Sequence, residues 1–75
     1  MDPTLHPYQQ RVVDEKAALD EKISKLEDFV LGAGKDKFLA LDLRDQLLLN
    51  DQHKHMLAYS HVLQQRIRRF YDPEA

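Results

Sequence analysis

Two apolar stretches at helical spacing, separated by the sequence GAGKDK (32–37), constrain the fold more than any other feature. In the first stretch, apolar residues recur at steps of seven, four, three and four: Val12, Leu19, Ile23, Leu26 and Val30. No segment alternates apolar and polar residues for long enough to make a strand. The sequence therefore predicts an all-α fold with two long amphipathic helices, about residues 7–31 and 43–70, and a short helical turn between them.

Residues that start and stop helices set these boundaries. Pro7 suits the opening position of a helix, where its missing N–H costs nothing. Gly32 and Gly34 are expected to end the first helix by adopting left-handed backbone at no steric cost. Asp42 is expected to cap the start of the second helix, because a side-chain oxygen there accepts from a free backbone N–H.

The predicted inner face of the second helix follows steps of four and three: Leu48, Gln52, Met56, Tyr59, Leu63, Ile67 and Phe70. A single domain of residues 1–75 buries too little apolar surface to be comfortably stable alone, and the chain has no cysteine for a disulfide. Self-association is the remaining source of stability. We therefore expect a homo-oligomer, either a dimer or a hexamer built from dimers.

Charge and hydropathy exclude several classes of function. The formal net charge of −2 provides no broad basic field for long nucleic acid. A DNA-binding role for the Arg66 to Arg69 cluster is disfavoured by the acidic first helix. No apolar run is long enough to span a membrane, and the N-terminal sequence lacks the layout of a signal peptide, so a cytoplasmic protein is expected.

The chain offers little catalytic or metal-binding chemistry. Ser24 and Ser60 are expected to lie isolated on helix surfaces, and Ser60 points away from the neighbouring His61 around the helix. His53 and His55 are two residues apart, whereas a metal-binding pair on a helix needs a spacing of three or four. We predict no catalytic residue, no metal site, no cofactor and no enzymatic activity.

The lysine and arginine side chains indicate more about the function of the chain than the serines and histidines do. Lys22 and Lys25 share one face of the first helix and form a cationic line with Lys16 and Arg11. The alternative is a solvated face of ion pairs, such as Lys16 with Asp20 and Glu21 with Lys25. Near the end of the second helix, three arginines either complement the helix dipole or clamp phosphates bidentately: Arg66, Arg68 and Arg69.

The segments YQQRVVDEKAALDEKISKLEDF (8–29) and HMLAYSHVLQQRI (55–67), followed by Phe70, resemble the phage anti-CBASS protein 2 family. That resemblance covers nearly the whole chain. It implies a helical sponge, in the cytoplasm of an infected bacterial host, that holds cyclic dinucleotides between subunits without cleaving them. Its function would be to block the host CBASS defence.

The resemblance also implies roles for individual residues. Tyr8 matches an aromatic residue that stacks on a base, and Lys22 or Lys25 matches a lysine that contacts the phosphates. Some members hold cyclic trinucleotides in separate pockets through arginine and histidine. His55, Arg66 and Arg69 are the weaker candidates for that role.

Symmetry makes a shared site reasonable. A cyclic dinucleotide has two bases and two phosphates, so a two-fold interface can offer each half of the ligand the same side chains. The alternative function is a helical adaptor, or a virion-associated protein–protein interaction module, with no nucleotide ligand. In that case Tyr8 would serve as a hydrophobic staple against Val12.

Overall fold

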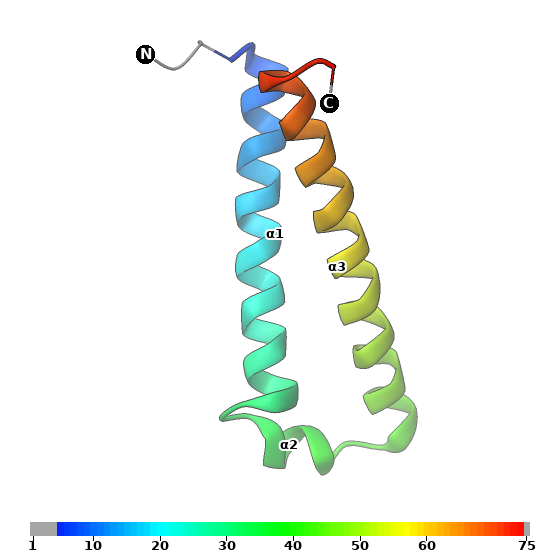
Figure 1. Ribbon diagram of the computed structural model, residues 1–75. Helices are drawn as coiled ribbons and strands as arrows, with labels where there is room; N and C mark the ends of the chain where they lie inside the picture. Colours follow the sequence, from blue (N-terminus) through cyan, green and yellow to red (C-terminus); the bar gives the residue numbers. More distant parts are fainter. Residues whose placement is uncertain (1–4, 75) are drawn as a thin grey trace.

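The computed structural model describes residues 5–74 and folds them into a helical hairpin (Figure 1). Helix α1 spans Pro7–Leu31, α2 spans Lys35–Leu39, and α3 spans Leu43–Tyr71. Residues 5–74 contain no strand. The predicted all-α fold, with two long helices and a short helical segment between them, is confirmed. The single domain 1–75 stays a prediction, and residues 1–4 and 75 lie outside the described part of the chain.

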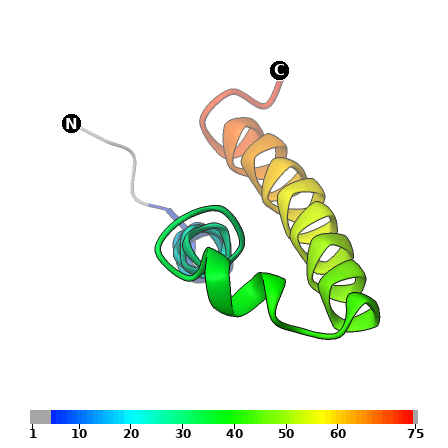
Figure 2. The same cartoon turned by 90° about the horizontal axis from the view of Figure 1, so that it is seen from below.

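Helices α1 and α3 run antiparallel, approach closely where α1 begins and α3 ends, and splay apart toward α2 (Figure 1). The short α2 bridges the bottom of the hairpin (Figure 2). Its buried Phe38 packs edge-on against Phe29 of α1, with ring centroids 5.9 Å apart. The side-chain amide of Gln46 donates to the carbonyls of Leu39 and Leu41, at 3.1 and 2.9 Å, and ties the first turn of α3 to α2.

A continuous seam with alternating steps of three and four residues joins the two long helices. On α1 the seam consists of Gln9, Val12, Lys16, Leu19, Ile23, Leu26 and Val30, all buried or half-buried. On α3 it consists of Gln46, Leu49, His53, Met56, Ser60, Leu63, Ile67 and Phe70, also buried or half-buried. This spacing is the heptad pattern of antiparallel helical pairs. It keeps one stripe of each helix facing the other along their full length.

The predicted inner stripe of α1 is confirmed, but the predicted stripe of α3 is partly wrong. Leu48, Gln52 and Tyr59 are exposed, and the seam instead passes through their neighbours Leu49, His53 and Ser60. The polar side chains tolerate these half-buried positions because acidic side chains of α1 bind them. A prediction based only on the spacing of apolar residues therefore chooses the wrong face of α3 at these positions.

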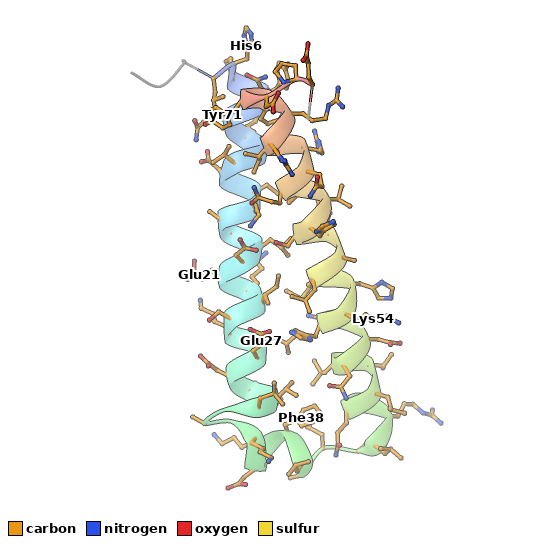
Figure 3. The ribbon with its side chains drawn as sticks, viewed as in Figure 1. His6, Glu21, Glu27, Phe38, Lys54 and Tyr71 are labelled. Carbon is orange, nitrogen blue, oxygen red and sulfur yellow. The ribbon has the colours of Figure 1, made fainter. Side chains whose placement is uncertain are left out.

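Hydrogen bonds and ion pairs run along one side of the seam. The Ser60 hydroxyl donates to Asp20 at 2.6 Å, and His53 Nε2 lies 2.8 Å from a carboxylate oxygen of Glu27, which points toward α3 in Figure 3. Lys16 Nζ lies 2.5 Å from Asp20. Ser60 is thus half-buried and bonded across the seam, contrary to its expected isolation. Both cross-helix pairs are seven residues apart on each helix, so together they fix the antiparallel register.

The expectation of left-handed glycines is wrong. Gly32 has a φ of −110° and Gly34 a φ of −89°. Gly34 is instead required by close approach, because a Cβ built there would lie 2.8 Å from the Cα of Phe29. The N–H of Gly34 donates to the carbonyl of Asp28 at 3.0 Å, and the N–H of Gly32 donates to the same carbonyl at 3.1 Å, so the chain turns tightly over the end of α1.

We predict that Leu63→Ala lowers the free energy of unfolding by about 2 to 5 kcal/mol, because the Leu63 side chain is 0% exposed and its removal leaves a cavity in the seam. Leu31→Ala is the matched control, since Leu31 is 73% exposed, and should change stability by less than about 0.5 kcal/mol. Urea unfolding followed by circular dichroism measures both. Equal losses in the two variants would contradict the packing described above.

A second prediction concerns acid stability. A hydrogen bond from Lys16, and after it one from Ser60, holds the pKa of the Asp20 carboxyl below its ordinary value of 3.8. The folded state therefore favours the ionised carboxylate. Its stabilisation is present at neutral pH and is lost as the pH falls below about 3.8 toward the folded-state pKa.

Asp20→Asn should therefore be less stable than the wild type at pH 7, and the difference should shrink by pH 3. The effect should be modest, because the Asp20 side chain is 44% exposed. Asp51→Asn, at an exposed carboxylate of α3, is the control for charge removal. Denaturant midpoints measured at several pH values test this, and a difference that stayed constant from pH 7 to pH 3 would argue against the assigned pair.

Candidate functional site

Tyr8 occupies the second position of α1, where the residue is 56% exposed. The ring lies parallel to that of His6, with centroids 5.8 Å apart and an interplanar angle of 8°. Its edge meets Phe70 near the end of α3, at 6.4 Å and 82°. The backbone N–H of His6 donates to the side-chain oxygen of Gln9 at 2.9 Å, which holds the start of the helix. Tyr8 is therefore held in place on one side and open on another.

A second stripe of α1 lies beside the buried seam and also alternates in steps of three and four. It begins at Tyr8 and consists of Tyr8, Arg11, Glu15, Ala18, Lys22 and Lys25, all exposed, followed by the half-buried Phe29. Residues with this spacing occupy one face of a helix. The candidates predicted on the first helix therefore share a face.

Helix α3 carries a matching exposed stripe: Leu48, Gln52, His55, Tyr59, Val62, Arg66 and Arg69. The Tyr59 hydroxyl donates to the carboxylate of Glu15, a member of the α1 stripe. This bond shows that the two stripes flank the same side of the hairpin. We call this side the aromatic-cationic face; it comprises Tyr8, Arg11, Glu15, Lys22, Lys25, His55, Tyr59, Val62, Arg66 and Arg69.

Contacts across the seam show which residues lie at the same level. Because Tyr8 meets Phe70 and Asp20 meets Ser60, Arg11 lies within about one helical turn of the level of Arg66. By the same reasoning, Lys22 lies within about one turn of the level of His55. The predicted candidates thus form two groups: Tyr8, Arg11, Arg66 and Arg69 near the chain ends, and Lys22, Lys25 and His55 near the middle.

These two groups are well separated in one chain. Tyr8 and Lys22 are 14 residues apart on a continuous helix, which corresponds to about 21 Å. Lys25 forms an exposed ion pair with Glu21 at 3.3 Å, as the solvated-face alternative predicts. No ion pair of Lys22 is found among residues 5–74, and its position between Ala18 and Lys25 places it on the aromatic-cationic face.

Charge is segregated around the hairpin. The aromatic-cationic face holds five of the chain's 11 lysines and arginines, although the formal net charge is −2. Helix α1 has six acidic residues, and only Glu15 lies on this face; the others are Asp14, Asp20, Glu21, Glu27 and Asp28. Glu21 points away from α3, and Lys54 points to the opposite outer side (Figure 3). Lysine and arginine side chains therefore outnumber acidic ones on the aromatic-cationic face, although the protein has a negative net charge.

Sequence reasoning missed three residues of this face: Glu15, Tyr59 and Val62. Tyr59 was assigned to the core, yet its side chain is 45% exposed, and that of Val62 is 51% exposed. The available signal was the helical spacing of the sequence from His55 to Arg66. Steps of four, three and four residues lead from His55 through Tyr59 and Val62 to Arg66, so all four share one face.

Other surface features hold none of the predicted site residues. A depression of about 300 Å³ at the start of α3 is lined by Asp42, Leu43, Arg44 and Leu47, at the opposite end of the hairpin from Tyr8. Within residues 5–74, no group of three or more His, Cys, Asp or Glu side chains is arranged to hold a metal ion. None of the described helices contains an apolar window suited to crossing a bilayer.

Comparison with known proteins identifies a family. Neither the curated proteins nor the solved structures include a significant match to the chain. A family model described as Sequestin matches residues 6–69, which include both stripes of the aromatic-cationic face. The family name is consistent with a sequestering rather than a catalytic role. Because the match covers most of the chain, this protein belongs to the Sequestin family.

Proposed function

We propose that this protein binds and sequesters cyclic nucleotide second messengers without cleaving them. The ligands are cyclic dinucleotides, and cyclic trinucleotides are further candidates. As a phage protein in the cytoplasm of an infected bacterium, it would block CBASS-type host defence. The aromatic-cationic face, on a net-acidic member of the Sequestin family, is the observation that carries this proposal.

The chain-end group supplies the chemistry for one base and its phosphate. The exposed ring of Tyr8 is a platform for base stacking, a contact that contributes about 1 to 3 kcal/mol. Arg11 and Arg66 lie at a similar level on the two helices, and arginine pairs with phosphate oxygens in a bidentate geometry. Arg69, one turn beyond Arg66, extends the same cationic group.

A partner subunit completes the site in this proposal. Lys22 lies about 21 Å from Tyr8 along α1, so it reaches a ligand stacked on Tyr8 only from another protomer. In residues 5–74 the buried apolar core consists of Val12, Ile23, Phe38 and Leu63. Exposed leucines gather toward the α2 end of the hairpin: Leu31, Leu39, Leu43, Leu47 and Leu48. Both observations support a homo-oligomer, and we propose either a dimer or a hexamer built from dimers.

The polar groups near the seam favour binding without cleavage. Ser60 donates its hydroxyl hydrogen bond to Asp20, and the lowered pKa of that carboxyl makes it a weak base. Neither group lies on the aromatic-cationic face. A nucleotide bound on that face would therefore lie away from this hydroxyl and this carboxylate.

We predict that wild-type protein binds a cyclic dinucleotide and that Tyr8→Ala weakens binding by about 1 to 3 kcal/mol for each stacked base, whereas Tyr8→Phe binds nearly normally. Arg66→Ala should also weaken binding. Arg68→Ala is its matched control, because Arg68 is exposed but two residues away and faces another direction. Calorimetric titration measures the affinities, and nucleotide released by heat denaturation should be chemically intact.

Each variant is also checked by light scattering and thermal melting, because Tyr8 contacts Phe70. The wild type should have a mass that is a multiple of the 8.8 kDa protomer. Full-affinity binding by both Tyr8→Ala and Arg66→Ala would contradict the proposed site. If the wild type bound no cyclic nucleotide at all, the adaptor function would become the leading hypothesis.

A further inference from the structure

We propose that Tyr59, Lys22 and His55 form a second aromatic-cationic subsite, which accepts a nucleobase and its phosphate. This inference rests on the proposed nucleotide-binding function and assigns a role to Tyr59 that the sequence did not suggest. The subsite lies on the same face as Tyr8 but nearer the middle of the hairpin.

Tyr59 has the exposure and the support of a stacking platform. Its side chain is 45% exposed, close to the 56% of Tyr8. Its hydroxyl donates to Glu15 on the other helix, which holds the ring across the boundary between α1 and α3. The neighbouring Val62 is 51% exposed and extends the apolar surface beside the ring. A planar base can therefore stack on a ring that is already positioned.

Basic side chains from both helices flank Tyr59. His55 precedes it by four residues and so lies one turn away on the same face of α3. Lys22 of α1 lies within about one turn of the level of His55, as the Asp20–Ser60 and Glu27–His53 pairs show. Both side chains are exposed. A phosphate attached to the stacked base would lie between them.

The bond between Tyr59 and Glu15 also engages the acidic side chain on this face. Glu15 is the acidic residue of α1 that lies on the aromatic-cationic face, where it would repel a phosphate. The hydroxyl of Tyr59 satisfies one of its carboxylate oxygens. The arrangement parallels that at Tyr8, where a ring is likewise accompanied by one cation from α1 and others from α3.

The test is calorimetric titration of a cyclic dinucleotide and a cyclic trinucleotide into four full-length proteins: wild type, Tyr59→Ala, Tyr59→Phe and Leu57→Ala. For the ligand that uses this subsite, Tyr59→Ala should weaken binding by about 5- to 150-fold, the range expected for one lost stacking contact. Tyr59→Phe should lose less affinity than Tyr59→Ala, because it keeps the ring and loses only the hydroxyl bond to Glu15. Leu57→Ala is the matched control, since Leu57 is also 45% exposed but faces another direction, and should bind normally.

A pair of lysine variants completes the design. Lys22→Ala should weaken the same ligand by about tenfold, whereas Lys54→Ala, on the outer side of α3, should not. Because Lys22 also reaches the ligand on Tyr8 of another protomer, the Tyr59 variants decide whether the subsite exists. If Tyr59→Ala retains wild-type affinity for both ligands, the subsite is wrong while the proposed function stands. If Tyr59→Ala loses affinity because its oligomer dissociates, which a lower mass in solution would show, Tyr59 is an interface residue. The subsite is wrong in that case too. If the wild type binds neither ligand, the proposed function itself fails.

Discussion

The pairing of α1 and α3 in one register is the constraint on which the other features depend. Asp20 binds Ser60 and Glu27 binds His53, so two bonds with equal spacing on both helices oppose sliding of one helix along the other. A rotation of α3 by one residue would move Tyr59 into the position of Ser60. The seam would then bury an aromatic ring that the observed structure leaves exposed.

This register also sorts the charges. Asp20 and Glu27 serve the polar side of the seam, so these acids of α1 lie away from Arg11 and Lys22. The cations then collect on the side where Tyr59 reaches Glu15. The result is a small positive surface with aromatic rings on a protein of negative net charge. Such a surface suits a small anion with planar groups better than a long nucleic acid, which would require a wider basic field.

The helices could be predicted because their signals are local: a proline at the start of α1, an aspartate cap before α3 and regular apolar spacing. The inner face of α3 could not, because His53 and Ser60 have the character of surface residues until Glu27 and Asp20, which are 26 and 40 residues away in the chain, satisfy them. Gly34 was correctly placed at the end of α1 but for the wrong reason, since its neighbour is the backbone of Phe29. The sequence provided the candidate cations and Tyr8. Their grouping on one face follows from the hairpin register, and so does the exposure of Tyr59.

The most direct test of the central claim is a backbone amide NMR titration of isotope-labelled protein with a cyclic dinucleotide, because it maps the bound surface without any substitution. The aromatic-cationic face should respond, with the largest changes at Tyr8, Arg11, Lys22, Tyr59 and Arg66. The outer sides of the hairpin should remain unchanged, including Asp14, Glu21 and Lys54. Changes confined to those outer sides, or to the depression around Leu43 and Leu47, would contradict the account.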